Sequence, residues 1–403
     1  MTDDVSAAAA VSLSEIRTPA KSGGLLASPG PLAVAAWLGV RLLNRPLRVG
    51  QVVIAARRAH VDEALGHDLA FGIAPINADR IEAVNGGPFV LGRDRNAELT
   101  RERRALYSAL SAVDMTALAD RAEAEADELL AGAGSSLDVV GGYARRVAGH
   151  TANRLFGINP PDDALFQEVA RAVFAHTFLN LGGDKAIEAR AVKAGRLMQA
   201  WFGDEIARRR RAKALGTDFM GGLLRQGQVD DNGVRRTLGG MLVGSIDTTA
   251  SAVAKIVYVL GRDRRLAAAV RADAADLAKM RGWCWEALRR WPHNPLVLRQ
   301  ALVDTTLGGV PVPAGAKVVA WTQAAMQDPQ AVPFPDEMRP DRPAQTYLHF
   351  GAGLHPCAGR AVNDWQIPML VGKLMARGVV QAGPIAWAGP FPDRLTVQLG
   401  AAR

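Results

Sequence analysis

The sequence predicts a mostly α-helical protein with a small β portion. From Glu98 to Leu260 the helix formers Ala, Leu, Arg and Glu dominate, with breaks at 159–161 (Asn-Pro-Pro) and 182–183 (Gly-Gly). After Pro292 this helix-forming composition is replaced by short runs of β-branched residues separated by turn residues. The chain has no internal repeat and no low-complexity linker, so we expect one folding unit.

Length and composition fit a single large domain that follows a short N-terminal segment. Of the 403 residues, 49% are hydrophobic and 22% are charged, which excludes a disordered chain. Residues 1–25 are rich in Ala, Ser and Gly and are predicted to be disordered. Large single cores do occur at this length, so we expect residues 26–403 to form one domain.

The β portion is predicted from short apolar runs bounded by turns. Val49 to Ala55 (VGQVVIA) is β-branched and is the first expected strand. The later strands are expected at Leu296–Val303, Gly309–Pro313 and Lys317–Trp321. A Pro-rich meander from Pro333 to Pro343 follows, and then a Gly-rich loop that leads into a helix starting at Gly359.

The net charge limits the classes of binding partner, and the cysteine content indicates the cellular compartment. A net charge of +8 permits nucleic acid, an anionic membrane or an acidic protein as partner. The densest basic run, Arg208 to Arg211, follows an amphipathic stretch and is expected to be the solvated end of a helix. No zinc-finger spacing or aromatic-interleaved basic motif supports nucleic-acid binding. Two cysteines, Cys284 and Cys357, cannot form a disulfide framework, which favours a reducing cytoplasm.

No segment is expected to span a membrane. Pro31 to Leu43 is apolar but too short for a bilayer, and it contains Arg41. Leu238 to Leu260 is nearly long enough, yet it carries Asp247 and Lys255, which are costly in hydrocarbon. We therefore interpret it as a buried helix.

The run Phe350-Gly-Ala-Gly-Leu-His-Pro-Cys-Ala-Gly359 is the most specific feature of the chain. Its glycines allow tight turns and close approach of the backbone to another group. Cys357 precedes a helix, where free N–H groups and the helix dipole favour a thiolate. A lone thiolate makes a poor zinc site but suits a single axial bond to haem iron, while a buried structural cysteine is the ordinary alternative.

This run resembles the haem-binding loop of the cytochrome P450 family, Phe-Gly-x-Gly-x-His-x-Cys-x-Gly, at every fixed position. The resemblance covers about residues 45 to 400 and implies the mostly α fold of that family. It also implies a haem-thiolate monooxygenase, with haem b held by Cys357 and contacted by Phe350, Gly351 and Gly359. Such an enzyme inserts one oxygen atom from O₂ into an organic substrate.

Glu286 and Arg289 are three residues apart and so share one face of a helix. By itself this spacing is typical of a surface ion pair. The pair resembles the Glu-x-x-Arg motif of the family, which an arginine of the meander completes. Arg342 occupies that place here, although Met338 stands where an aromatic residue is usual. The resemblance implies a structural role for these three residues.

Gly244, Asp247, Thr248 and Ser251 form a polar stripe in the apolar segment Leu238–Leu260. Burying a polar side chain costs free energy unless the side chain has hydrogen-bond partners or a functional role. A buried cluster in which every polar group is hydrogen-bonded is therefore one explanation of the stripe. The stretch also resembles the family's distal helix, in which an acid and an alcohol deliver protons. On that basis Asp247 and Thr248 are the predicted catalytic residues. Ser245 replaces the usual glycine.

Three cations are candidates for the two haem propionates. The resemblance implies Arg299, on the strand after the Glu-x-x-Arg helix, and His355, inside the cysteine loop. Arg103 resembles the arginine of the family's His-x-x-x-Arg helix, but Leu99 stands in place of the histidine. An arginine can bind a carboxylate through two hydrogen bonds.

By analogy with the family, the substrate pocket draws on eight residues without a fixed charge, which predicts a small or medium hydrophobic substrate. They are Phe89, Val90, Leu91, Met241, Gly244, Pro295, Leu296 and Val297. No flavin or ferredoxin module fits in this length, so electrons are expected from a separate acidic ferredoxin or flavodoxin. Two alternatives remain: a peroxide-driven peroxygenase or isomerase, and a non-catalytic haem-binding sensor.

Overall fold

The computed structural model describes residues 11–17, 29–388 and 391–400, and these residues form two compact units. The first, here called the helical unit, comprises residues 11–17, 77–122 and 145–247. The second, here called the mixed unit, comprises residues 29–76, 123–144, 248–388 and 391–400. Residues 11–17 contain a short helix, α1 (Leu13–Ile16), and the rest of the N-terminal segment predicted to be disordered lies mostly outside the described residues.

In its described residues the helical unit contains helices but no strands. Its chain order is α1, most of α4 (Ala74–Asn85), η3 (Val90–Gly92), α5 (Ala97–Ser111), the start of α6 (Met115–Gly132), α7 (Arg145–Phe156), α8 (Asp163–Phe174), η5 (Ala175–Leu179), α9 (Lys185–Ala212), α10 (Phe219–Gln226) and α11 (Asp231–Val243). Aspartates set the beginnings of the later helices: the side chains of Asp162, Asp184, Asp218 and Asp230 accept hydrogen bonds from N–H groups of the first turn.

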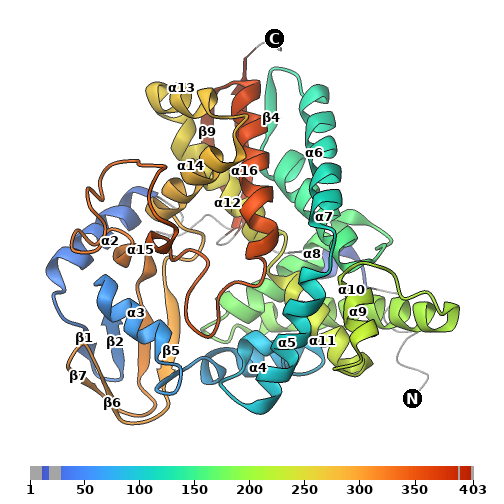
Figure 1. Ribbon diagram of the computed structural model, residues 1–403, viewed down its shortest axis with the longest axis horizontal. Coiled ribbons are helices and arrows are strands. Elements are labelled where there is room, and N and C mark those ends of the chain that lie inside the picture. Colours follow the sequence, from blue (N-terminus) through green and yellow to red (C-terminus); the bar gives the residue numbers. More distant parts are fainter. Residues whose placement is uncertain (1–10, 18–28, 389–390, 401–403) are drawn as a thin grey trace. The chain divides into compact units, whose positions relative to one another are not determined.

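The mixed unit holds all the described strands together with the C-terminal helices. The helices are α2 (Pro29–Leu42), α3 (Arg58–Gly66), the end of α6, η4 (Val140–Ala144), α12 (Asp247–Gly261), α13 (Arg264–Ala272), α14 (Leu277–Arg290), α15 (Thr322–Ala325), η6 (Ala344–Thr346) and α16 (Arg360–Arg377). Helices α14 and α16 pack against each other and lie side by side in Figure 1.

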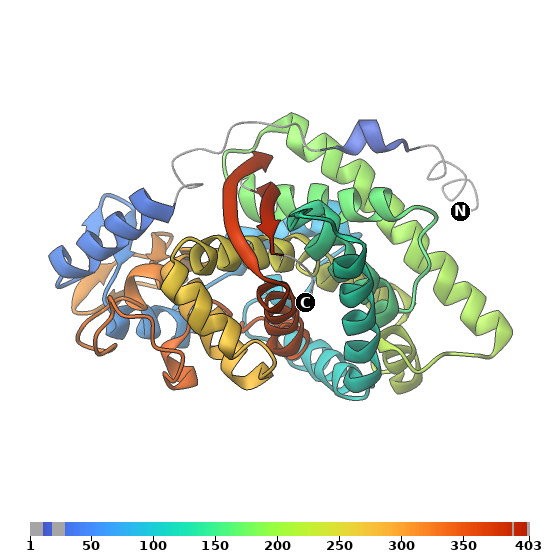
Figure 2. The same cartoon turned by 90° about the horizontal axis from the view of Figure 1, so that it is seen from above.

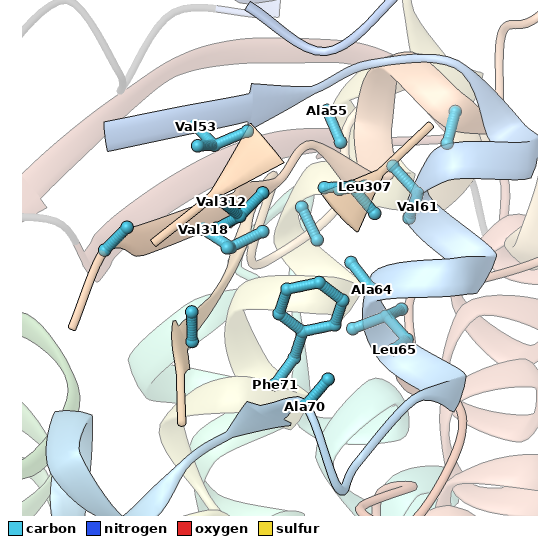
Figure 3. Close-up of a cluster of buried hydrophobic side chains, with 14 of the residues drawn as sticks. Val53, Ala55, Val61, Ala64, Leu65, Ala70, Phe71, Leu307, Val312 and Val318 are labelled. Carbon is cyan, nitrogen blue, oxygen red and sulfur yellow. The ribbon is translucent and has the colours of Figure 1, made fainter. Parts of the chain in front are cut away.

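The largest sheet has five strands in the order β1-β2-β8-β5-β3. These are β1 (Leu47–Val49), β2 (Val52–Ala55), β8 (Lys317–Ala320), β5 (Val297–Ala301) and β3 (Phe71–Gly72). Strands β2 and β8 are parallel, and the other neighbours are antiparallel. Helix α3 contacts β2 and β8, and Val61, Ala64 and Leu65 of this helix pack with Val53, Phe71 and Val318 in a buried apolar core (Figure 3).

Two smaller sheets complete the mixed unit. Strands β4 (Ser136–Asp138), β10 (Phe391–Leu399) and β9 (Val379–Ala388) form one, and β6 (Thr305–Leu307) with β7 (Val310–Val312) forms the other. Figure 2 shows β9 and β10 as a long curved pair directly after α16. Strand β7 was predicted from the sequence, whereas β3, β4, β6, β9 and β10 were not.

Two predicted elements differ in the structure. The single strand expected at Val49–Ala55 is instead a hairpin of β1 and β2, because Gly50 adopts a φ of +57° and reverses the chain. The continuous helix expected at Leu238–Leu260 is interrupted after Val243, and α12 begins at Asp247. As a whole, the segment Asp231–Gly261 is long and apolar enough to cross a bilayer, but 72% of its apolar window is buried, as in a core helix.

Candidate functional site

The cysteine loop folds as its glycines require. Gly351 and Gly353 have φ values of +70° and +73°, in the left-handed region that other residues rarely adopt. A β-carbon on Gly353 would lie 1.9 Å from the carbonyl oxygen of Leu65, so that position accepts only glycine. The Cys357 N–H donates to the carbonyl of Phe350 at 2.8 Å and closes the loop. Helix α16 then starts at Arg360, close to the predicted position.

The Cys357 side chain is exposed, and its sulfur accepts hydrogen bonds from the N–H groups of Gly359 and Arg360. Desolvation of the sulfur by the surrounding protein atoms raises the pKa of the Cys357 thiol. The two N–H groups and the Arg360 guanidinium favour the thiolate and act in the opposite direction. Gly359 is not in the left-handed region; its φ is −72°. A β-carbon there would lie 3.6 Å from the sulfur, so glycine leaves space beside it.

Cys284 is an unsuitable ligand by comparison. It is fully buried inside α14, and burial raises the pKa of its thiol strongly. A metal ligand must be reachable and deprotonated. Of the two cysteines in the chain, the structure therefore favours Cys357.

An aromatic cluster that the sequence analysis missed supports the start of the loop. The ring of Phe350 meets Trp285 edge-on at 5.2 Å and lies 4.6 Å from the ring of His349. Burial lowers the pKa of His349 to about 3, with a smaller contribution from Arg360, so this imidazole is neutral. The side chain of Trp285 comes from α14, which ties the loop to the helix that carries Glu286.

Glu286 and Arg289 form the expected pair and are completely buried. The Nε and Nη2 atoms of Arg289 each donate to the carboxylate at 2.9 Å, and Nε of Arg342 lies 3.2 Å from Oε1. The structure adds a partner that sequence reasoning missed, because the Tyr347 hydroxyl donates to Oε1 at 3.2 Å. Tyr347 lies three residues before Phe350, so the network reaches the cysteine loop.

The break between α11 and α12 places the predicted alcohol at the beginning of a helix. Ser245 Oγ donates to the carbonyl of Met241 at 2.6 Å, and this side-chain bond competes with regular helix formation. Thr248 is half-buried in the first turn of α12. Its neighbour Thr249 donates to Asn363 Oδ1 of α16 at 3.1 Å, which links α12 to the helix that follows Cys357. Ser251 Oγ lies 2.9 Å from His293 Nδ1.

Asp247, the predicted acid, is buried in an ion-pair cluster of the helical unit. Its Oδ1 accepts from Nη2 and Nε of Arg171 at 2.7 and 3.0 Å, and Nε of Arg145 lies 3.3 Å away. Glu168 pairs with the same Arg145 at 3.2 Å. Two guanidiniums stabilise the ionised form of this carboxylate. Neither arginine was identified from the sequence, because both are far from Asp247 in the chain.

The predicted propionate-binding residues are distributed over both units. In the mixed unit, Arg299 is buried on β5, with Nη1 donating to the carbonyl of Leu298 at 2.9 Å, and His355 is half-buried in the cysteine loop. In the helical unit, the Arg103 guanidinium lies 5.4 Å from the Tyr107 ring on α5.

The predicted pocket residues include both packed and accessible side chains. In the helical unit Phe89 packs so closely on α11 that a β-carbon on Gly240 would lie 2.3 Å from its ring. Val90 and Met241 are also buried, Leu91 is half-buried, and Gly244 is exposed with open space beside it. In the mixed unit Leu296 is exposed and its neighbours Pro295 and Val297 are half-buried.

The donor set fits a haem group better than a protein-only metal site. The described residues contain no cluster of three or more His, Cys, Asp or Glu side chains that could hold a metal ion. Cys357 offers one accessible sulfur supported by two N–H groups, which suits a metal that takes a single protein ligand on one side. Arg299, a buried guanidinium of the same unit, suits a carboxylate.

Comparisons with known proteins identify the family. The cytochrome P450 family profile matches residues 202–377. Mycinamicin IV hydroxylase/epoxidase of Micromonospora griseorubida is 30% identical over 310 residues, which are 74% of each chain. Biflaviolin synthase of Streptomyces coelicolor is 26% identical over 81% of each chain.

Solved structures agree on the fold. The open form of cytochrome P450 EryK from S. erythraea matches with a TM-score of 0.78 at 23% identity, covering 95% of this chain and 98% of that one. Ligand-free CYP164A2 of Mycobacterium smegmatis gives a TM-score of 0.78 at 23% identity, covering 93% and 98%. The predicted mostly α fold is thereby confirmed. The chain belongs to the cytochrome P450 family, whose monooxygenases hold haem b through an axial cysteine thiolate.

Proposed function

We propose that Cys357 is the axial ligand of the haem in this P450 monooxygenase and that the substrate is a small or medium hydrophobic molecule. The observation that carries the assignment is the accessible Cys357 sulfur, which receives two N–H groups at the start of α16 while Cys284 is buried. Hydrogen bonds to a thiolate sulfur adjust how much electron density it donates.

When bound, haem supplies the activation of dioxygen, and the side chains of this chain bind, orient and deliver protons. Arg299 and His355, with Arg103 as a third candidate, would bind the haem propionates. The Thr248 hydroxyl, at the start of α12, would accept and donate the proton that this chemistry requires. Asp247 fixes the entry into α12 through its two arginines and supplies the negative charge that the relay requires.

The substrate and the electron donor are inferred from residue chemistry. The candidate pocket residues Phe89, Val90, Leu91, Met241, Gly244, Pro295, Leu296 and Val297 offer apolar surface without a charge that would anchor a carboxylate. We propose an acidic ferredoxin or flavodoxin in the cytoplasm as the donor. Arg101, Arg104 and Arg360 are exposed, and such cations speed the encounter with an acidic protein.

The carbon monoxide complex of the reduced protein tests the ligand assignment. Thiolate ligation gives a strongly red-shifted Soret band, which we expect for the wild type and for Cys284→Ala. Cys357→His should abolish the band, because imidazole donates less charge to iron than thiolate does. Loss of the band in Cys284→Ala with retention in Cys357→His would reverse the assignment.

One observation also favours a peroxide-driven enzyme as a second candidate. Oδ1 of Asp247 is engaged by two arginines, which makes this carboxyl a poor proton donor. An enzyme that takes peroxide directly needs fewer delivered protons than one that uses O₂. Product formation with hydrogen peroxide alone, at a rate equal to that with a reductase system, would support this candidate.

A further inference from the structure

The segment 16–61 has an unusual charge distribution. It contains seven Lys and Arg residues and no Asp or Glu, in a chain whose net charge is +8. In the structure Arg41, Arg57 and Arg58 pair with Asp336, Asp328 and Asp62, while Arg45 and Arg48 remain exposed cations of this segment. Blocks of a single charge sign are typical of segments that meet an oppositely charged partner.

Helix α2, within this segment, is apolar on two opposite faces. Ala36 and Val40 are fully buried and pack in a small core with Ala56 and Ala324, the latter on α15 beside α2 in Figure 1. The opposite face exposes Val34, Trp37, Leu38 and Leu42, which are 39% to 73% accessible. Their spacing of i, i+3, i+4 and i+8 places them on one side of the helix.

Exposed apolar residues and cations also follow α2 in the chain, where Arg48 lies between Leu47 and Val49 of β1 and donates from Nη1 to the carbonyl of Pro311 at 3.2 Å. Leu47 and Val49 of β1 are exposed, and so are Arg45 and Arg48 next to them. The Arg41 guanidinium lies 3.9 Å from the Trp37 ring and pairs with Asp336 at 3.5 Å. Six of the fifteen large hydrophobic residues that the described chain exposes fall between Val34 and Val49, so exposed apolar side chains are concentrated in this short segment.

We propose that this α2–β1 surface (Val34, Trp37, Leu38, Leu42, Arg45, Leu47, Arg48 and Val49) binds an anionic membrane surface without spanning it. A helix of 14 residues is too short to cross a bilayer, but it can lie in the interface with its apolar face among the acyl chains. Tryptophan and leucine enter the interface, and arginines pair with anionic headgroups.

The charges argue against the other possible occupants. A second copy of the chain, meeting this surface symmetrically, would bring arginines against arginines. Residues 18–28 of the same chain carry Lys21 and no acidic residue, so they offer no complementary charge. An anionic bilayer satisfies both the apolar and the basic parts of the surface.

Co-sedimentation of the haem-loaded protein with vesicles tests the proposal. Vesicles of phosphatidylglycerol and phosphatidylcholine should bind the protein, and pure phosphatidylcholine should bind it much less. Arg45→Gln/Arg48→Gln should weaken binding about fivefold for each arginine. Trp37→Gln/Leu42→Gln should weaken it about tenfold or more, because buried apolar area is lost.

Matched controls separate this surface from general charge and hydrophobicity. Arg208→Gln/Arg211→Gln removes two exposed cations of α9, and Leu69→Gln/Leu181→Gln removes two exposed leucines elsewhere. Both controls should bind as the wild type does, and all variants should keep the thiolate carbon monoxide band, which shows that they are folded.

Three outcomes would overturn the proposal. One is equal binding to both kinds of vesicle, and another is an equal loss of binding in the control variants. The third is a concentration-dependent dimer, detected by sedimentation velocity, that Trp37→Gln/Leu42→Gln abolishes. That result would assign the surface to a second copy of the chain.

Discussion

Replacing Glu286 by Gln removes one negative charge from a site that is closed to water. In the structure this carboxylate accepts from Nε and Nη2 of Arg289, from the Arg339 N–H at 2.9 Å and from the Tyr347 hydroxyl, with Arg342 3.2 Å away. Glutamine keeps the size of the side chain but leaves the buried Arg289 guanidinium without its counter-charge. Breaking a buried ion pair from one side costs about 3–5 kcal/mol.

That cost is a large share of the stability of a folded domain, which is about 5–15 kcal/mol in total. Urea unfolding of the haem-loaded protein, followed by circular dichroism, measures it directly. The control is Asp62→Asn, because Arg58 and Asp62 form a half-exposed pair on one turn of α3 at 2.8 Å. Such pairs contribute about 0.3–0.5 kcal/mol. If Glu286→Gln lowers the unfolding free energy no more than Asp62→Asn does, the network has no stabilising role.

Three further predictions concern α12. Thr248→Ala should keep haem and substrate binding but release more peroxide and less product per electron, since proton delivery is disturbed; unchanged coupling removes Thr248 from the relay. Thr249→Val should lower the unfolding free energy by about 1 kcal/mol, whereas Thr249→Ser should restore it, because the hydroxyl bonds to Asn363. Burial lowers the pKa of Lys255 to about 7, so unfolding takes up a proton between pH 7 and the ordinary lysine pKa. The wild type should therefore gain stability relative to Lys255→Met as the pH rises through that window, and a pH-independent difference in chemical unfolding would contradict this.

The sequence predicted the parts of the site that depend on local rules. The loop from Phe350 to Gly359 was identifiable because its glycines and cysteine match the spacing of a known family motif, and the structure places Gly351 and Gly353 in the left-handed region that such glycines permit. The spacing of Glu286 and Arg289 predicted that the two side chains share a helix face and can pair, while their structural role came from the family resemblance. Arg342, more than fifty residues further on, came from the family resemblance alone.

Elements that depend on distant pairing were missed. Strand β4 has three residues and pairs with β10, which lies about 260 residues later in the chain, so no local pattern identifies it. The long pair of β9 and β10 contains Gly383 and two prolines, which obscure the alternation typical of strands. At Gly50 the positive φ separates β1 from β2, yet a glycine between β-branched residues is also compatible with one strand.

The polar stripe illustrates why residue type alone does not assign a role. Gly244, Asp247, Thr248 and Ser251 were expected to share one face of a regular helix, and the family resemblance made Asp247 and Thr248 the predicted catalytic pair. In the structure the helix begins at Asp247, and the three side chains have different surroundings. Asp247 is ion-paired with Arg171, Ser251 contacts His293, and Thr248 is the half-buried member at the start of the helix. A carboxylate held by two guanidiniums stays ionised and cannot easily carry a proton, whereas a hydroxyl donates and accepts in turn. Of the predicted acid and alcohol, the alcohol is therefore the residue whose surroundings suit proton transfer, and the acid is better suited to fixing the position of that alcohol.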